Sequence, residues 1–158
     1  MDAETFTDYV RKYRNTVFRV AYSYSGSLQD SEDITQETFL KLYKSEERFT
    51  ANENVKAWLI RVSANEAKNF IRRNALRRKE PISENIPEED YELSEIMKGL
   101  KRDYRVVIYL HYYEGYSVKE LSKILKISES NVKVRLKRGR DKLKELISEK
   151  GEYYAQIR

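Results

Sequence analysis

The sequence lacks cysteine and contains little glycine, proline or histidine. None of the 158 residues is Cys, which excludes disulfides and thiolate metal sites. The 5 Gly and 2 Pro are too few for a turn-rich β protein, and no apolar run approaches the roughly 18 residues that a membrane-spanning helix needs. The N-terminus MDAETFTDYVRKY has no apolar signal core. These absences predict a soluble, cytoplasmic protein.

Charge is abundant and unevenly distributed. Charged residues make up 36% of the chain, and the helix-favouring Lys, Glu, Leu and Arg dominate its long segments. Residues 56–79 contain eight cations and one acid, residues 80–97 contain seven acids and no cation, and residues 117–146 contain ten cations and four acids. Two separated basic segments indicate two contacts with a polyanion. The alternative is a pair of solvated helix faces joined by an acidic linker.

An acidic segment divides the chain. Pro81 and Pro87 bracket EPISENIPEED, which has little apolar periodicity and is typical of a linker. We therefore predict an all-α fold with two small helical domains, residues 1–79 and 93–158, joined by a flexible acidic linker at residues 80–92.

Three amphipathic helices are predicted in the first domain. The first is defined by apolar residues at helical spacing, namely Phe6, Tyr9, Val10, Tyr13, Val17, Val20, Ala21 and Tyr24. Gly26 ends it, and Ser27 can cap a second helix, LQDSEDITQETFLKLYKS, whose inward residues are Ile34, Phe39, Leu42 and Tyr43. ERFTANEN is predicted to be a loop. A third helix, from about Val55 to Arg78, carries the apolar stripe Trp58, Leu59, Val62, Phe70 and Ile71.

A helix-turn-helix is predicted in the second domain. It follows a helix that ends at Glu114 and Gly115 and has the inward residues Leu100, Val106, Val107, Leu110 and Tyr113. Ser117 stands three residues before Glu120, as in a capping box, and opens a short helix. After a turn at residues 126–128, Ser128 caps a longer helix with matching apolar positions.

The second helix of this motif has a cationic outer face. If Val132 and Leu136 are buried, an outward strip remains, made of Lys133, Val134, Lys137 and Arg138. In a helix-turn-helix this helix enters the major groove, where Arg and Lys suit guanine and Val suits a thymine methyl group. Contacts to phosphates or bases are also predicted at the sides and start of the helix, for Ser130, Asn131, Arg135 and Arg140. The alternative is a basic helix in a plain bundle.

Several motifs resemble those of bacterial sigma factors. DSEDITQETFLKLY and NVKAWLIRVSANEAKNFIRR resemble region 2 of these proteins, and the C-terminal unit, residues 93–158, resembles region 4. Two helical domains with a short linker resemble the extracytoplasmic-function (ECF) subfamily of the sigma-70 family. The resemblance implies a sigma factor that binds core RNA polymerase, directs promoter-specific transcription initiation and helps to open the DNA, with no catalysis of its own.

The resemblance also implies roles for individual residues. The second helix would dock on the largest polymerase subunit through Asp33, Gln36 and Glu37. The minus-10 promoter element would be read and opened by residues of the third helix and the loop before it, namely Asn52, Asn54, Lys56, Arg61, Asn65, Lys68, Asn69, Arg72 and Arg73. The minus-35 element would be read by Ser130, Asn131, Lys133, Val134, Arg135, Lys137, Arg138 and Arg140.

The implied partners are macromolecules. They are core RNA polymerase, double-stranded promoter DNA with its opened non-template strand, and an anti-sigma factor, which in the family is often membrane-bound. No cofactor, metal or small-molecule substrate is implied.

Two other functions stay open from the residues themselves. A free-standing helix-turn-helix regulator that binds an operator as a dimer explains residues 117–140, but it leaves the acidic second helix and the second basic helix without a role. A magnesium-dependent nuclease would use the acids Asp30, Glu32, Asp33 and Glu37.

Overall fold

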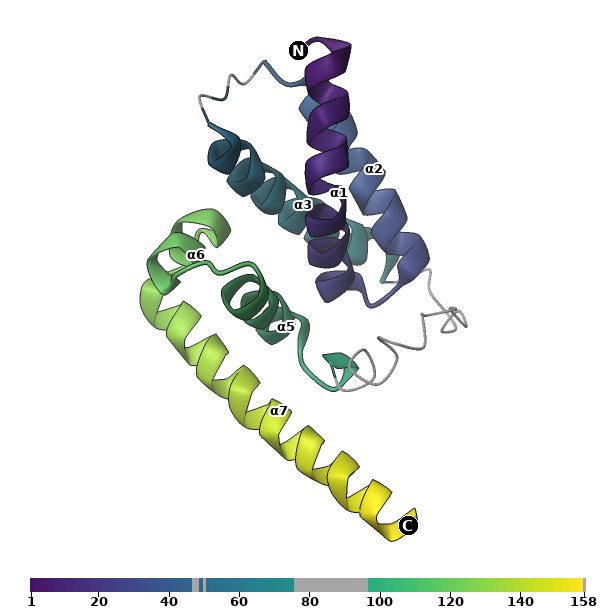
Figure 1. Ribbon diagram of the computed structural model, residues 1–158, viewed down its shortest axis with the longest axis vertical. Helices are drawn as coiled ribbons and strands as arrows, with labels where there is room; N and C mark the ends of the chain where they lie inside the picture. The colour runs from purple at the N-terminus through teal and green to yellow at the C-terminus, as the bar shows by residue number, and fades with distance from the viewer. Residues whose placement is uncertain (47–48, 50, 76–96, 158) are drawn as a thin grey trace. The chain divides into compact units, whose positions relative to one another are not determined.

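The chain folds into helices arranged in two compact units. A computed structural model describes residues 1–46, 49, 51–75 and 97–157, and every regular element within these ranges is helical (Figure 1). The all-α prediction is confirmed. The units comprise Met1–Glu84 and Asn85–Arg158. The predicted linker, residues 80–92, lies outside the described residues, so the exact domain bounds stay predictions.

Unit 1 is built from three helices, α1 (Ala3–Ser25), α2 (Leu28–Lys44) and α3 (Asn52–Asn74) (Figure 1). Asp2 caps α1 by accepting a hydrogen bond from the Thr5 backbone N–H at 2.8 Å. Gly26 ends α1 in the left-handed conformation, with φ of 66°. Ser27 then caps α2, where its hydroxyl accepts from the Asp30 N–H at 3.1 Å. Both the Gly26 stop and the Ser27 cap agree with the sequence prediction.

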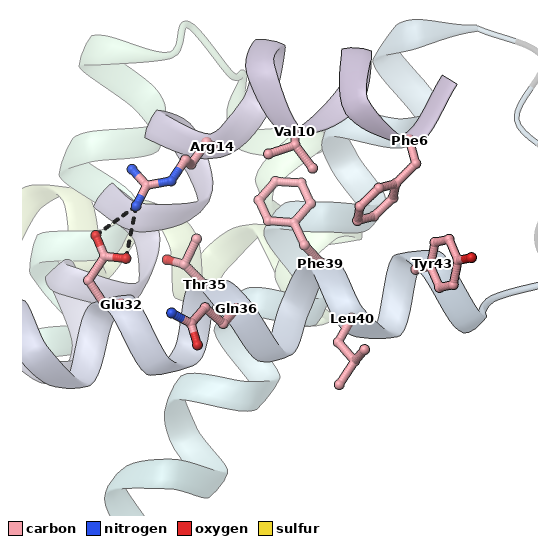
Figure 2. A pocket seen from close by; sticks show the side chains of 9 residues that line it. All are labelled: Phe6, Val10, Arg14, Glu32, Thr35, Gln36, Phe39, Leu40 and Tyr43. Carbon is pink, nitrogen blue, oxygen red and sulfur yellow. Dashed lines mark hydrogen bonds and ion pairs between the residues drawn. The ribbon is translucent and has the colours of Figure 1, made fainter. Parts of the chain in front are cut away.

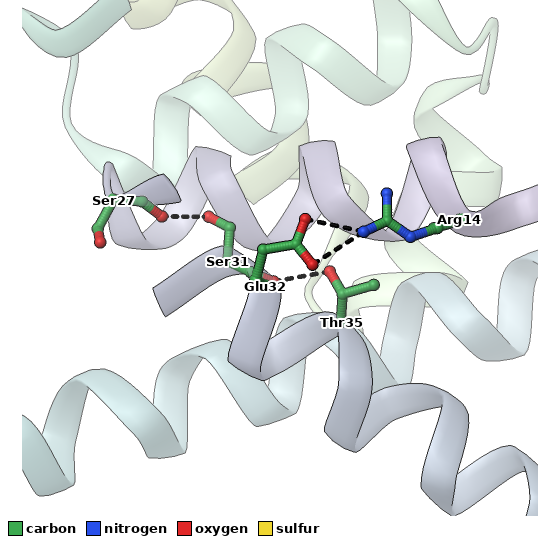
Figure 3. Close-up of polar contacts among 5 residues, drawn as sticks. All are labelled: Arg14, Ser27, Ser31, Glu32 and Thr35. Carbon is green, nitrogen blue, oxygen red and sulfur yellow. Dashed lines mark hydrogen bonds and ion pairs between the residues drawn. The ribbon is translucent and has the colours of Figure 1, made fainter. Parts of the chain in front are cut away.

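The three helices of unit 1 bury one another's apolar faces. Their shared core contains Tyr13 and Val17 of α1, Phe39 and Leu42 of α2, and Leu59 of α3, among others. The inner face of α2 also carries small hydroxyl residues, whose side chains donate to the carbonyl four residues earlier: Ser31 to Ser27, Thr35 to Ser31, and Thr38 to Ile34 (the first two in Figure 3). These bonds satisfy the buried hydroxyls with the backbone of α2 and its N-cap. The Ser31 hydroxyl is also hydrogen-bonded to the Ser25 hydroxyl at the end of α1, at 2.9 Å.

Two predictions in unit 1 were wrong in detail. The helix α3 begins at Asn52 rather than Val55, so the last residues of the predicted loop form its first turn, where the Asn54 N–H donates to the Ala51 carbonyl at 3.1 Å. Tyr43, predicted to face inward, is 54% exposed. It follows the fully buried Leu42, and the rotation of about 100° per residue in a helix carries its ring to the rim, against the edge of Phe6.

Unit 2 contains α5 (Arg102–Ile108), a π-helical turn η1 (Tyr109–Tyr113), α6 (Val118–Leu125) and α7 (Glu129–Ile157). In η1 the Glu114 N–H donates to the Tyr109 carbonyl, five residues earlier, at 3.2 Å. This wider turn changes the register of the apolar stripe. Leu110 is fully buried, whereas Tyr113, predicted to face inward, is 65% exposed.

The predicted helix-turn-helix is confirmed as α6, a short turn and α7. The capping box is complete, because the Glu120 N–H donates to the Ser117 hydroxyl and the Ser117 N–H donates to the Glu120 carboxylate, both at 3.1 Å. Lys126 adopts the left-handed conformation, with φ of 56°, and turns the chain. The Ser128 hydroxyl accepts from the Asn131 N–H at 3.0 Å at the start of α7.

The helix α7 packs against α5 as well as α6 and continues beyond them. Val132 and Leu136 are buried in the core of unit 2. A Cβ atom placed on Gly139 would lie only 3.0 Å from Cγ1 of Ile108, so the absence of a side chain allows α7 to approach α5 closely. The helix then runs through the C-terminal segment as far as Ile157.

The capping box gives unit 2 a stability that depends on pH. Hydrogen bonding of the carboxylate with Ser117, first with its backbone N–H and then with its side chain, lowers the pKa of Glu120 below its ordinary value. The ionised form therefore favours the folded state. Its contribution is complete above the unfolded-state pKa and is lost as the pH falls through the lowered folded-state pKa.

We expect Glu120→Gln to lower the free energy of unfolding at neutral pH by an amount that shrinks as the solution is acidified through this range. Ser117→Ala should cost about 1 kcal/mol at neutral pH. Urea denaturation followed by circular dichroism at several pH values measures both effects, with Glu129→Gln in the first turn of α7 as a matched control. A Glu120→Gln effect that does not change with pH contradicts the assignment.

Candidate functional site

The outer face of α7 is a continuous cationic strip. Val132 and Leu136, which face the core, are 0% and 3% exposed. On the other side of the helix the exposed residues are Lys133, Val134, Lys137 and Arg138. Val134 is 43% exposed and provides an apolar contact within the strip. The arrangement presents three cations and one apolar side chain on a single helical surface of unit 2.

The residues beside this strip have partners within unit 2. Arg140 donates from a guanidinium nitrogen to the Tyr112 hydroxyl at 2.9 Å. Arg135 is half-buried, and its Nε donates to the Asn131 side-chain oxygen at 3.1 Å. Ser130 and Asn131 are both exposed in the first turn of α7. The strip is therefore flanked by two arginines whose side chains are already oriented by protein groups.

A second polar face lies along α3. Asn65, Asn69 and Arg72 are exposed and follow one another at intervals of four and three residues, so they share one side of the helix. Arg61, half-buried, lies four residues before Asn65, and the exposed Asn54 lies eleven residues before it, which is about three turns. Arg73 is exposed at one edge of this face. All six of these residues belong to the group predicted from the sequence.

Three other residues predicted for this group differ from these six in their position or in their contacts. Lys56 is half-buried and lies nine residues before Asn65, which places it on the opposite side of α3. Lys68 is half-buried, with its ammonium group 5.7 Å from the ring centre of Tyr24 in α1. Asn52 lies in the first helical turn, not in a loop.

Trp58 belongs to the core rather than to the polar face. It is half-buried and packs against the apolar cluster of unit 1, with its ring 5.9 Å from that of Phe49 in an edge-to-face arrangement. This agrees with the prediction from its helical spacing with Leu59 and Val62.

Glu66, the one acid among residues 56–79, is turned away from the polar face of α3. Glu66 is 7% exposed, and its carboxylate forms an ion pair with the Lys41 ammonium group of α2. In the described part of α3 from Val55 onward, no other carboxylate is present. The outer face therefore presents only amides and cations to an approaching polyanion.

The third surface lies on α2. Asp33, Gln36 and Glu37 are exposed and share one side of the helix. Leu40, which follows Gln36 by one turn, is 43% exposed and extends this side with an apolar residue. The surface thus combines two carboxylates, an amide and an apolar side chain.

An apolar groove between α1 and α2 adjoins this surface (Figure 2). Its walls are mostly apolar, and the residues that line it are Phe6, Val10, Arg14, Glu32, Thr35, Gln36, Phe39, Leu40 and Tyr43. Arg14 donates from one guanidinium nitrogen to both oxygens of Glu32, each at 2.8 Å (Figures 2 and 3). This ion pair bridges the two helices at the polar end of the groove and leaves Glu32 less available to a partner than Asp33 or Glu37.

The apolar part of this surface was not predicted from the sequence. Leu40 was not assigned, and Tyr43 was placed in the core, yet both line the groove and are exposed. A signal was present, because Leu40 lies three and four residues after the predicted docking residues Glu37 and Gln36 and must share their side of a helix.

The acids of the nuclease alternative are not arranged as a metal site. Glu32 is held by Arg14. Within the described ranges, no group of three or more His, Cys, Asp or Glu side chains is placed to hold a metal ion. The same ranges contain no helix with the length and apolar character to cross a membrane.

Comparison with known protein families finds two matches in this chain. Residues 9–77 match the model of Sigma-70 region 2, and residues 91–143 match that of Sigma-70, region 4. The first match contains the α2 and α3 surfaces, and the second contains the helix-turn-helix.

Curated relatives are similar over nearly the whole chain. It is 27% identical to the ECF RNA polymerase sigma factor SigE of Mycolicibacterium smegmatis, over 96% of this chain and 65% of that protein. It is 28% identical to the ECF RNA polymerase sigma factor SigW of Bacillus subtilis, over 90% of this chain and 89% of that protein. It is 29% identical to the ECF RNA polymerase sigma factor SigM of Bacillus subtilis, over 90% of this chain and 94% of that protein.

Solved structures share the fold. The sigma factor RpoE of Bartonella quintana, in complex with the anti-sigma factor NepR, superposes with a TM-score of 0.77 at 23% identity, over 92% of this chain and 98% of that one. CnrH, in complex with the cytosolic domain of CnrY, gives a TM-score of 0.69 at 24% identity, over 93% and 90%.

The pairing of Glu66 with Lys41 yields a test of the α2–α3 contact. Lys41→Met would leave the largely buried carboxylate of Glu66 without its cation. Because the Lys41 side chain is 49% exposed, solvent offsets part of the cost. We expect a loss of roughly 1–3 kcal/mol in the free energy of unfolding.

Urea denaturation measures this loss. Lys44→Met, on the exposed side of the same helix, is the control, and Glu66→Gln in the Lys41→Met background should restore most of the stability. Equal effects of the two lysine substitutions refute the pairing.

Proposed function

The chain belongs to the ECF group of the sigma-70 family of bacterial RNA polymerase sigma factors, and from this premise we propose that it binds core RNA polymerase and directs transcription initiation at specific promoters. The observation that carries the proposal is the cationic strip on α7, set in a complete helix-turn-helix whose opposite side is fully packed. Region 4 lies at this position, and region 2 contains the other two surfaces.

Unit 2 recognises the minus-35 element in this proposal. The strip on α7 enters the major groove, where Lys133, Lys137 and Arg138 donate to guanine or to phosphates and Val134 contacts a thymine methyl group. The flanking Arg140 is already oriented by Tyr112, and this suits a phosphate contact at the groove edge.

Unit 1 recognises and opens the minus-10 element. Duplex stacking amounts to about 1.4 kcal/mol per step, and extruding one base costs a few kcal/mol. The amides of Asn65 and Asn69 on the α3 face can form hydrogen bonds with the edges of unpaired bases. The cations of Arg72 and Arg73 suit the phosphate backbone of the separated strand.

Both units contribute to the salt dependence of DNA binding. If together they neutralise about six phosphates, the logarithm of the binding constant falls with the logarithm of the salt concentration with a slope near −5.

The α2 surface docks on the polymerase. Asp33, Gln36 and Glu37 supply polar contacts, while Leu40 and the adjoining groove supply an apolar anchor. An acidic and apolar helix face of this kind fits an amphipathic helix with basic residues. The chain itself supplies no catalysis, since polymerisation belongs to the core enzyme.

The alternative function, a regulator that binds an operator as a dimer, explains fewer of the surfaces described above. It would use α6 and α7 and leave the α2 and α3 surfaces of unit 1 without a role. Promoter recognition with polymerase uses all three.

An anti-sigma factor is proposed as a further partner, and membrane attachment would come through that partner. The support is the similarity to two sigma factors whose structures are complexes with NepR and with the cytosolic domain of CnrY. Such a partner would hold the chain away from polymerase by covering surfaces that the polymerase needs.

The docking surface is tested by Gln36→Ala combined with Glu37→Ala. We expect the affinity for core polymerase to fall about tenfold or more, the loss expected when the substituted residues belong to the minority of interface residues whose truncation costs about 1 kcal/mol or more. Transcription from promoters that the wild-type holoenzyme uses should fall in parallel. Binding is measured with labelled core enzyme, and transcription is measured in vitro across a promoter library.

The matched control is Asp8→Ala combined with Asn15→Ala, two exposed residues of α1. Undiminished binding of the α2 variant would reject the docking role. Failure of the wild-type chain to start any transcript with core polymerase would reject the function itself.

Strand opening is tested by Asn65→Ala. We expect the rate of opening to fall roughly fivefold, the effect of losing one hydrogen bond of about 1 kcal/mol, with little change in the initial closed complex. Time-resolved permanganate reactivity of minus-10 thymines measures opening, and filter binding at low temperature measures the closed complex. Asn15→Ala is the control, and wild-type permanganate kinetics for Asn65→Ala would exclude a role in opening.

A further inference from the structure

Tyr112 lies at the surface of unit 2, where the π-helical turn η1 presents it to solvent. It is 56% exposed, although tyrosine carries a large apolar ring. The ring packs edge to face against that of His111, with the ring centres 4.9 Å apart. His111 is itself held by a hydrogen bond of 2.6 Å from its Nδ1 to the Tyr116 carbonyl. One side of the exposed ring is therefore supported by the protein, and π-turns of this kind are frequent at functional sites.

The Tyr112 hydroxyl accepts one hydrogen bond and has its own proton left to donate. It accepts from a terminal guanidinium nitrogen of Arg140 at 2.9 Å, and this bond links η1 to α7. Since a guanidinium group has donors but no acceptor, the phenolic proton takes no part in the bond. In the part of the chain that the structure describes, that proton is donated to no protein group. The O–H can therefore donate to a ligand.

Arg140 also has donors left, and it lies in a row of cations. Lys133, Lys137 and Arg140 follow one another at intervals of four and three residues, so they share one side of α7. Arg140 is exposed, and no carboxylate within the described ranges forms an ion pair with it. An anion at the end of this row would meet both the guanidinium group of Arg140 and the O–H of Tyr112.

A DNA phosphate is the anion that this pair suits. Arginine and tyrosine side chains are both common donors to phosphate oxygens. Donation from an O–H to a charged oxygen is roughly twice as strong as donation to a neutral one, and the bond from Arg140 polarises the O–H further. Arg140 lies beside the outward strip of α7, and the sides of a recognition helix face the phosphates that border the groove.

We infer that Tyr112 contacts DNA directly, as a donor to the same backbone phosphate that Arg140 binds. The inference rests on the proposed function, because it requires α7 to lie in the major groove. It adds η1, which comes before the helix-turn-helix, to the elements that contact DNA. A contact of this kind reads no base, so it strengthens binding to every promoter equally and fixes how α7 is placed in the groove.

The hydroxyl is tested by Tyr112→Phe, which removes one oxygen and leaves the ring against His111. We expect the holoenzyme, core polymerase with the full chain, to bind promoter duplexes about tenfold more weakly, the effect of losing one hydrogen bond to a charged group. The factor should be the same for different upstream sequences. Filter binding at low temperature measures it. The matched control is Tyr113→Phe, which removes the hydroxyl of the neighbouring exposed tyrosine and should leave binding unchanged.

The contacted phosphate is located with duplexes in which one phosphate at a time is replaced by a neutral methylphosphonate. Replacement at one position should weaken binding of the wild type about tenfold, and it should weaken Tyr112→Phe and Arg140→Met severalfold less. Arg140→Met should also reduce the salt slope by about 1, whereas Tyr112→Phe removes no charge and should leave the slope unchanged.

A double substitution separates direct contact from positioning. If the phenolic O–H binds the phosphate itself, Tyr112→Phe should still weaken binding about threefold or more in the Arg140→Met background. If Tyr112 only orients Arg140, the second substitution has no further effect.

Three results would overturn the inference. The first is binding by Tyr112→Phe that equals that of Tyr113→Phe. The second is the absence of any further loss in the double variant, and the third is a methylphosphonate pattern that is the same for Tyr112→Phe as for the wild type. Failure of the proposed function gives a different pattern, since Lys137→Ala, in the outward strip, would then leave DNA binding unchanged as well.

Discussion

Burial of a single apolar stripe on each helix is the constraint on which the surfaces of this protein depend. In α7, Val132 and Leu136 can be buried against α5 and α6 only if the opposite side, with Lys133 and Lys137, faces outward. The same rule fixes α3, where the burial of Leu59 and Ser63 turns Asn65 and Asn69 to the exterior. The core packing within each unit is therefore enough to turn these polar faces of α3 and α7 toward solvent.

Ion pairs within the protein change which charges these faces present to solvent. Glu66 is paired with Lys41 under α3, Glu32 with Arg14 beside the groove, and Asp103 with Arg135 beside α7. The first pair removes a negative charge from the α3 face that we propose binds DNA. The second joins α1 to α2 and leaves Asp33 and Glu37 as the acids open to a partner. The Arg14–Glu32 and Arg135–Asp103 pairs lie at the surface and add little stability, so their main effect is on which charges and hydrogen-bonding atoms remain for ligands.

Much of this could be predicted from the sequence because it depends on local chemistry. The caps at Ser27, Ser117 and Ser128 are set by short-range hydrogen bonds, and the faces of α3 and α7 are set by helical periodicity. The exposed Tyr113 was mispredicted because nothing in the apolar spacing signals the π-turn, which adds a residue and rotates the stripe. Tyr43 was mispredicted because whether a rim residue is covered depends on the neighbouring helix. Lys41, the partner of Glu66, and Asp103, one partner of Arg135, are distant in the sequence, so no spacing rule could have found these pairs. Asn131, the other partner of Arg135, lies one helical turn before it.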